Sequence, residues 1–209
     1  MSDKRVCGID FDNTIVTYDE LLTRIARERG LLDSRTPASK RTIRDWIRLL
    51  PDGEVEWQKC QALLYGSRIQ EARLNDGVSR FIQLCHGRGV EVYVISHKTE
   101  YSRYDTTGTN LRDAALSWMA ANGFFEPDHL GLTRDRIFFA ETRREKINRL
   151  TDTRCTDFID DLEETFLEEA FPPDVTRILY EPGRQCPPPS GVKLTRSWQE
   201  ISDYFFAGN

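Results

Sequence analysis

The sequence predicts an α/β protein with a Rossmann-like parallel sheet core, helices on both faces of the sheet, and a small all-helical insert. Three observations support this fold class. The first apolar strand pattern of the chain lies at residues 6–10. Residues 18–75 then show only helical periodicity. From residue 76 on, strand patterns alternate with helical patterns, which is typical of a parallel sheet with right-handed crossovers.

The composition is that of a soluble globular protein, since 39% of the 209 residues are hydrophobic and 30% are charged. This length allows one sizeable core, or a core with a small insert. The net charge is −5 and no basic run occurs, which argues against nucleic acid as a partner. No apolar stretch could span a membrane and residues 1–5 are polar, so we expect no membrane partner and a cytoplasmic location. The oligomeric state is left open.

The cysteines and tryptophans are predicted to be structural. The five cysteines lie far apart with no Cys-x-x-Cys pair, which favours reduced, mostly buried thiols over disulfides or a zinc site. Each tryptophan stands at helical spacing with other apolar residues, so we expect all four to pack in the core, namely Trp46, Trp57, Trp118 and Trp198.

Residues 18–75 are predicted to form three helices. The first, at residues 18–29, has an apolar face that includes Leu21, Leu22 and Ile25, and it ends at Gly30. A polar linker at residues 33–39 precedes a second helix that ends near Leu50. The turn Pro51-Asp52-Gly53 then leads to a third helix at residues 54–73.

The remaining chain is predicted to alternate between helices and strands. Helices are expected near residues 76–87, 110–121, 141–150, 162–170 and 197–206, and strands at residues 90–95, 136–140, 156–160 and 176–180. We interpret Pro187-Pro188-Pro189 as a stiff connector. Ligands of such sheets bind at the carboxyl ends of the strands, so polar residues at these ends are the candidate site.

Two aspartates stand at the end of the first strand. Asp10 and Asp12 are two positions apart, so on an extended segment their side chains point the same way. Two carboxylates aimed at one place repel each other unless a cation lies between them. Turn chemistry or helix capping would explain Asp12 and Asn13, but it does not explain Asp10, which still belongs to the apolar strand.

The segment Asp10-Phe11-Asp12-Asn13-Thr14 after an apolar strand resembles the first motif of the haloacid dehalogenase-like (HAD-like) superfamily of phosphotransferases. Three further signals follow in the expected order. Ser96 comes after the second strand, Lys146 lies on the helix before the fourth strand, and Asp160-Asp161 ends that strand. Each has a simpler interpretation: a cap or turn serine, a solvated lysine, and a helix cap in which Asp161 stands at capping-box spacing from Glu164. Their joint appearance favours the superfamily.

The resemblance covers nearly the whole chain and implies two domains. Residues 1–17 and 76–209 would form the α/β catalytic core, and residues 18–75 would form a helical cap inserted into it. The pattern Asp-x-Asp-Asn-Thr with a terminal Asp-Asp looks like the nucleotidase-like branch. It also resembles small phosphatase-like proteins of sugar or polysaccharide pathways.

The activity implied is that of a Mg²⁺-dependent phosphohydrolase, a phosphomonoesterase of a small phosphorylated metabolite such as a nucleotide or sugar phosphate. Asp10 would be the nucleophile that forms an aspartyl-phosphate, and Asp12 would carry the proton. Ser96 and Lys146 would bind the transferring phosphoryl group. The candidate metal ligands are Asp10, Asp12 (by resemblance through its backbone carbonyl), Asp160 and Asp161, an all-oxygen set that suits Mg²⁺.

Several assignments remain open in the sequence. Lys146 stands only about four helical turns before Asp160, closer than in many members, so Arg143, Arg144 and Lys98 are rivals for the third-motif cation. Either Asp160 or Asp161 could be the direct metal ligand. The alternative function is a non-catalytic binding module that keeps the fold but has lost turnover.

The residues that would select the substrate are predicted from the first motif, from the neighbours of Ser96 and from the basic and aromatic groups of the cap. The candidates are Thr14, His97, Lys98, Arg41 and Tyr65, with Lys40, Arg44 and Arg68 as further basic groups of the cap. For the arginines, a solvated helix face is an equally good interpretation.

Overall fold

The computed structural model describes residues 4–33 and 40–207. These residues form two compact units, which are described separately. The first comprises residues up to 15, residues 74–98 and residues from 123 on, and the second comprises residues 16–73 and 99–122. The predicted linker at residues 33–39 lies, apart from Asp33, outside the described residues.

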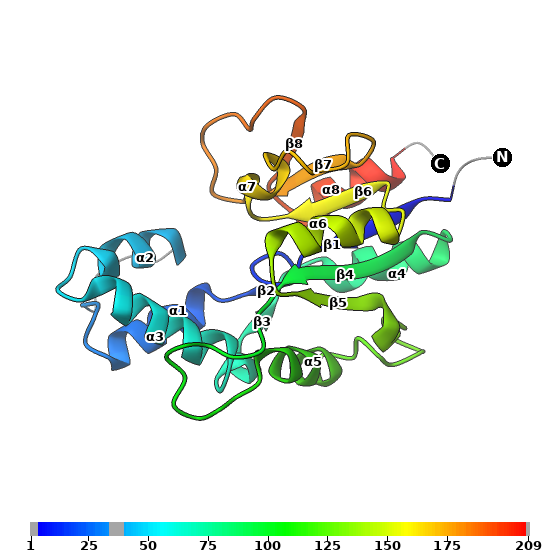
Figure 1. Cartoon of the computed structure of the whole chain (residues 1–209). Coiled ribbons are helices and arrows are strands. Elements are labelled where there is room, and N and C mark those ends of the chain that lie inside the picture. The colour runs from blue at the N-terminus through cyan, green and yellow to red at the C-terminus, as the bar shows by residue number, and fades with distance from the viewer. Residues whose placement is uncertain (1–3, 34–39, 208–209) are drawn as a thin grey trace. The chain divides into compact units, whose positions relative to one another are not determined.

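The first unit is built on a six-stranded sheet in the order β5-β4-β1-β6-β7-β8 (Figure 1), in which every pair of neighbours is parallel. The strands are β1 (Val6–Ile9), β4 (Glu91–His97), β5 (Ile137–Ala140), β6 (Asp157–Asp160), β7 (Thr176–Tyr180) and β8 (Val192–Thr195). Because β1 is central, the first strand of the chain pairs with strands that follow much later in sequence. The predicted Rossmann-like parallel core is confirmed.

Helices cover both faces of this sheet. The first unit contains α4 (Val78–Gly87), the 3₁₀ turn η2 (Arg134–Arg136), α6 (Arg143–Asp152), α7 (Glu163–Phe166) and α8 (Trp198–Phe206). In Figure 1, α6 lies in front of the sheet and α4 behind it. On the face of α6, Ile147 and Leu150 join a buried cluster with Phe158 of β6. On the other face, the Phe81 ring of α4 packs against Trp198 of α8, with ring centroids 5.3 Å apart.

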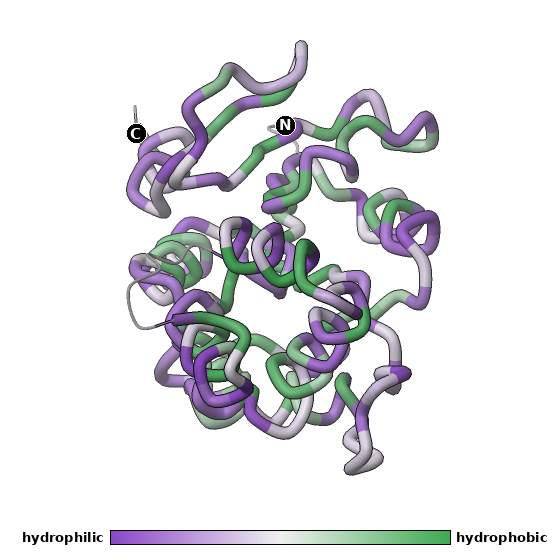
Figure 2. Tube along the Cα trace, turned by 90° about the vertical axis from the view of Figure 1, so that its left-hand side faces the viewer, coloured by the Kyte–Doolittle hydropathy of each residue, from purple (hydrophilic) through white to green (hydrophobic). Residues whose placement is uncertain are grey.

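The second unit is helical. It contains α1 (Asp19–Glu28), α2 (Lys40–Arg48), α3 (Gly53–Tyr65), the 3₁₀ turn η1 (Ile69–Glu71) and α5 (Leu111–Ala121). The helices α1, α2 and α3 pack against one another, and α5 packs against α3 and η1. Hydrophobic and hydrophilic residues alternate along the helices (Figure 2), so each can bury one face. Two short strands, β2 (Val16–Thr17) and β3 (Arg73–Leu74), pair where residues 15–16 and 73–74 connect the units.

Two predicted helices are shorter in the structure, and one strand of the six-stranded sheet was missed. The third helix of the insert ends at Tyr65 rather than at residue 73, because Gly66 follows with φ −110° and ψ −109°, which side-chain-bearing residues avoid. The helix expected at residues 162–170 is only α7. Strand β8 was not predicted, since it is short, includes an exposed lysine and follows three prolines.

The tryptophan prediction is wrong at one position. Trp57, Trp118 and Trp198 are buried, but Trp46 is 49% exposed. Its helix α2 buries Ile43 and Ile47 instead, and the Trp46 indole Nε1 donates a hydrogen bond to the Leu31 carbonyl, 3.2 Å away. All five cysteines are free thiols, and only Cys186 is exposed.

An ion pair between the half-buried Arg5 and the buried Asp157 joins β6 to the segment before β1. The Arg5 guanidinium donates to both carboxylate oxygens of Asp157 at 2.8 and 2.9 Å, and it lies 3.7 Å from the centroid of the Phe205 ring. The Thr156 hydroxyl also donates to Asp157, at 2.7 Å. This carboxylate therefore lies at the amino end of β6, opposite the end at which Asp160 stands.

Replacing Gly8 by alanine should destabilise the protein, because β1 leaves no room there for a methyl group. A Cβ atom would come within 2.8 Å of the Phe158 ring and 3.0 Å of the Cys155 Sγ. We expect a loss of about 1–3 kcal/mol in the free energy of unfolding, measured by chemical denaturation. The control is Gly87→Ala at the end of α4, where a Cβ meets nothing within 4 Å. Equal stabilities of the two variants would contradict the packing argument.

Candidate active site

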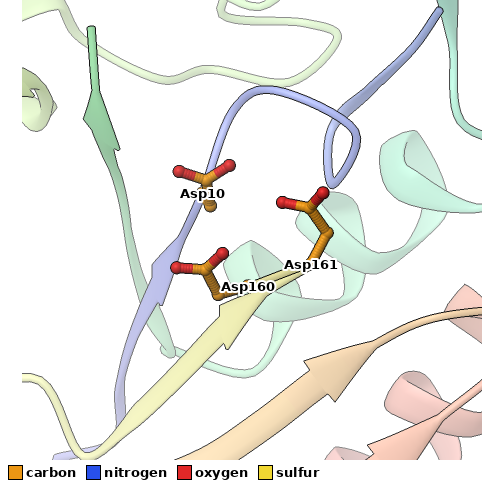
Figure 3. Close-up of side chains that lie close together, drawn as sticks. All are labelled: Asp10, Asp160 and Asp161. Atoms are coloured by element: carbon orange, nitrogen blue, oxygen red, sulfur yellow. The ribbon is translucent and has the colours of Figure 1, made fainter. Parts of the chain in front are cut away.

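The carboxyl ends of two neighbouring strands bring the predicted acidic residues together. Asp10 follows β1, while Asp160 ends β6 and Asp161 comes next. Their carboxylates gather at this edge of the sheet (Figure 3). One oxygen from each lies within 4.8 Å of the others, with Asp10 and Asp160 buried and Asp161 half-buried. Three carboxylates this close are a group that could hold a metal ion.

The Lys146 ammonium contacts this acidic group. It lies in the first turns of α6, whose N-cap Thr142 accepts a hydrogen bond from the Glu145 N–H. The buried Lys146 Nζ is 2.6 Å from an Asp10 oxygen and 2.7 Å from an Asp160 oxygen. One ammonium thus bridges two carboxylates of two different strands.

Neither arginine neighbour on α6 makes a comparable contact. Arg143 forms an exposed ion pair with Glu168 at 2.7 Å, and Arg144 is exposed. Among the rivals for the third-motif cation, the structure therefore brings Lys146, not Arg143 or Arg144, to Asp10.

Burial and neighbouring charges perturb both partners of the Asp10–Lys146 pair. Burial raises the pKa of Asp10 to about 7: the Lys146 ammonium opposes the increase, and the negative charges of Asp160 and Asp12 add to it. Burial alone would lower the pKa of Lys146, but Asp10 and Asp160 together raise it above its ordinary value. Lys146 therefore stays protonated.

The loop after β1 is held by long-range hydrogen bonds. Asn13 adopts a left-handed conformation with φ 60°, which asparagine tolerates better than most residues. Its side-chain amide donates to an Asp161 oxygen at 3.1 Å. The Thr14 carbonyl accepts from the Asn75 side chain at 2.8 Å and from the Trp198 Nε1 at 3.3 Å. These bonds fix the backbone that carries Asp10 and Asp12.

Asp12 is paired with a buried lysine. The Lys98 Nζ lies 2.8 Å from one carboxylate oxygen of Asp12 and 3.1 Å from the other. The Asp12 side chain does not belong to the group of Asp10, Asp160 and Asp161. Lys98 thus contacts the second aspartate of the loop, and Lys146 contacts the first.

Comparisons with known proteins bear on the fold. No protein-family model matches the chain, and no curated protein is similar to it at a significant level. Solved structures do match over almost the whole chain. The haloacid dehalogenase-like hydrolase SP0104 from Streptococcus pneumoniae superposes with a TM-score of 0.62 at 14% identity, covering 99% of this chain and 100% of its own.

The fold is that of the HAD-like hydrolases.

Two further structures with this fold agree. The HAD-hydrolase YfnB from Bacillus subtilis, solved bound to magnesium, gives a TM-score of 0.57 at 14% identity and covers 96% of this chain and 98% of its own. A HAD family hydrolase from Deinococcus radiodurans R1, solved with bound phosphate and sodium, gives 0.55 at 13% identity and covers 98% and 96%. The predicted resemblance is thereby confirmed for the fold, while the nucleotidase-like branch and the helical-cap type stay predictions.

Ser96 and His97 lie near the carboxyl end of β4 in this HAD-like fold. Ser96 is buried and belongs to the strand, two positions beyond Val94, which pairs with Ile9 of β1. Ser96 therefore stands at the same sheet edge as Asp10. His97 is exposed, and its Nε2 lies 2.9 Å from the Glu141 carbonyl.

The capping interpretation of Asp161 is wrong. The N-cap of α7 is Leu162, with no side-chain capping bond. Asp160, rather than Asp161, accepts a hydrogen bond from the Leu162 N–H at 3.0 Å. The Asp161 carboxylate faces the acidic group and Asn13 instead.

Thr14 combines burial with an unsatisfied side chain. Its hydroxyl is buried and makes no hydrogen bond within the described structure. Buried polar atoms normally have a partner, so this hydroxyl is unusual. The role of Thr14 in substrate binding stays a prediction.

Arg41 and Tyr65 belong to the helical unit. The Tyr65 ring packs edge-on against Tyr18, with centroids 5.1 Å apart, and the Lys40 Nζ lies 5.5 Å from its centroid. Arg41 is exposed. Arg44 pairs with Asp45, and Arg68 pairs with Glu28 and Glu71. The roles of these residues in substrate binding, and of residues 18–75 as a cap, stay predictions.

Two residues that hold the site were missed by sequence reasoning. The side chains of Asn75 and Trp198 donate hydrogen bonds to the Thr14 carbonyl, and they lie 61 and 184 residues from Thr14 in sequence. Asn75 had a weak signal, since it lies just before the first core helix after the insert. Trp198 had none, because an indole nitrogen in an apolar helix face gives no hint of its partner.

Proposed function

We propose that the chain is a Mg²⁺-dependent phosphomonoesterase that hydrolyses a small phosphorylated metabolite, such as a nucleotide or sugar phosphate, through an aspartyl-phosphate on Asp10. The observation that carries this proposal is the buried Asp10–Lys146–Asp160 bridge beside Asp161 at the carboxyl ends of β1 and β6. It supplies a nucleophile and a cation for the phosphoryl oxygens in one place.

The donor set fits a divalent cation. Asp10, Asp160 and Asp161 offer only oxygen atoms, which Mg²⁺ prefers. With Asp12, the site holds four carboxylates, which carry four formal negative charges. The ammonium groups of Lys146 and Lys98 balance two of them, so a formal charge of −2 remains. We assign the metal to Asp10, Asp160 and Asp161, with Asp12 contributing through its backbone as the resemblance implies. Bound Mg²⁺ would neutralise phosphoryl charge during transfer.

The chain's own residues would perform two displacements. First, an Asp10 oxygen attacks phosphorus, the bond from phosphorus to the leaving oxygen breaks, and that oxygen keeps the electron pair and takes a proton from Asp12. Water then attacks the phosphorus, Asp12 accepts its proton, and the bond to Asp10 breaks with the electron pair returning to Asp10. Inorganic phosphate leaves. Lys146 and Ser96 would hold the equatorial oxygens, on which charge accumulates.

The substrate would be held by further polar and aromatic groups of the chain. We propose Thr14, His97 and Lys98 from the core, and Arg41 and Tyr65 from the helical unit. Binding energy from such groups can raise turnover on the true substrate. Two structures with the same fold were solved with magnesium and with phosphate, respectively, and these ligands are of the kinds proposed here.

A screen of phosphorylated nucleotides and sugars with the purified protein, with Mg²⁺ and with EDTA, tests the proposal. Phosphate release that EDTA abolishes supports it. Substituting Asp161→Asn should raise the Mg²⁺ concentration for half-maximal activity about tenfold or more, because one charged ligand is lost. Asp174→Asn, the same change at an exposed position, should leave it unchanged. Binding of Mg²⁺ and phosphate esters without any turnover would favour the non-catalytic binding module.

A further inference from the structure

Asp12 lies outside the acidic group and contacts a lysine. It stands two residues after Asp10, yet the carboxylates within 4.8 Å of one another in the described structure are Asp10, Asp160 and Asp161. Both oxygens of Asp12 face the Lys98 ammonium instead, at 2.8 and 3.1 Å. A lysine thus contacts the one aspartate of the loop that lies outside this group of three carboxylates.

Lys98 is itself firmly placed. It directly follows β4, and its backbone N–H extends the pairing with β5 by donating to the Ala140 carbonyl at 2.9 Å. The residue is only 4% exposed, and its Nζ lies 5.4 Å from the centroid of the Phe11 ring. A buried ammonium requires a charged partner, and Asp12 provides one. The ion pair therefore favours the positions in which these two side chains meet.

A cation among Asp10, Asp160 and Asp161 would attract the Asp12 carboxylate. Coulomb attraction is strong at such short range in a partly buried site, and a ligating carboxylate has fewer oxygens left to exchange a proton with substrate. The positive charge of Lys98 competes for the same carboxylate. Asp12 then stays paired with Lys98 and does not join the metal ligands.

We propose that Lys98 is a positioning residue that holds the Asp12 carboxylate away from the metal ligands and keeps it available for proton transfer to and from the reacting oxygens. This inference rests on the proposed function. It assigns Lys98 this role in place of the substrate contact proposed above, and it predicts that Lys98 acts through Asp12.

The kinetic test compares two leaving groups in the Lys98→Met variant. For an alkyl phosphate, whose leaving oxygen needs a proton, the rate of the first step should fall about 10²–10⁴-fold. For a nitrophenyl phosphate, whose leaving group needs little protonation, the burst of nitrophenol should slow by less than about tenfold. Equal losses for the two esters would overturn the proposal, because a general structural defect does not distinguish leaving groups.

A double-mutant cycle tests whether Lys98 acts through Asp12. In an Asp12→Asn background, adding Lys98→Met should change the alkyl phosphate rate less than about threefold, since the group that Lys98 positions is already gone. Losses that multiply would mean that Lys98 acts independently and would overturn the inference.

A binding measurement keeps this test separate from the proposed function. The measured quantity is the Kd for Mg²⁺, obtained by calorimetry. When residue 12 is aspartate, Lys98→Met should lower this Kd by a factor about tenfold larger than when residue 12 is asparagine, because only the carboxylate can join the metal ligands. The same tightening in both backgrounds would sink the inference. This cycle needs no substrate. If the protein hydrolyses none of the esters, the phosphomonoesterase proposal is refuted, and calorimetry still decides whether Lys98 keeps Asp12 from the metal ligands.

Discussion

Replacing Asp10 by asparagine should abolish ester hydrolysis, lowering kcat by roughly 10⁴-fold or more, because no aspartyl-phosphate can form without the carboxylate nucleophile. The loss should be as large for esters with very good leaving groups, since these still need a nucleophile at phosphorus. The measurement is steady-state phosphate release from nitrophenyl phosphate and from the best metabolite found in the screen. Circular dichroism of the variant checks that the fold is kept.

The matched variant is Asp12→Asn, which distinguishes the two aspartates of the loop. Its first step should be nearly normal for esters with good leaving groups, but hydrolysis of the phosphoenzyme should be slow because water lacks its base. The variant should release a burst of alcohol and accumulate one phosphoryl group on Asp10, seen as added mass in intact-protein spectrometry. A phosphoryl group found on Asp12, or an active Asp10→Asn protein, would reverse the assignment.

Replacing Arg5 by methionine should lower the free energy of unfolding by about 3 kcal/mol, because the buried Asp157 carboxylate would lose its ionic partner. Methionine also removes the guanidinium from above the Phe205 ring, so the loss includes this cation–π contact. For a chain of this size, that loss corresponds to a decrease in Tm of about 6–12 °C, measured by scanning calorimetry.

The control is Arg73→Met. Arg73 also forms an ion pair, with Glu20 at 2.6 Å, but both side chains are about two-thirds exposed. Exposed pairs contribute little to stability, so Tm should hardly change. If the two substitutions lowered Tm equally, burial of Asp157 would not be the cause.

The sequence predicted the elements that have strong periodic patterns. The strands around Val92, Phe138, Phe158 and Ile178 and most helices were expected, because a parallel strand buried on both faces is nearly continuously apolar. Strand β8 escaped, because an edge strand needs less apolar surface and its four residues include Lys193. The end of α3 depended on the backbone of Gly66, which no periodicity reports.

The candidate site was predictable where sequence order dictates spatial order. Asp10 directly follows β1 and Asp160 ends β6, and these strands are neighbours in the sheet. The expectation that ligands bind at the carboxyl ends of parallel strands was therefore enough to predict that these two residues meet. The choice of Lys146 over Arg143 depended on which face of α6 meets the sheet. The contacts of Lys98 with Asp12 and of Arg5 with Asp157 join residues 86 and 152 positions apart, and a single sequence carries no signal for such pairs.

The hydrogen bond from Trp198 to the Thr14 carbonyl has a consequence for how the protein matures. Its two ends are 184 residues apart, so the loop bearing both aspartates cannot be fully fastened until α8 has left the ribosome. At ordinary rates of synthesis this delay is roughly 10–40 s after Thr14 is made. β1 waits similarly, because its neighbour β6 lies about 150 residues downstream. In a nascent chain, the loop with Asp10 and Asp12 would therefore lack part of its hydrogen bonding. The active geometry of this loop would form as one of the last events of folding.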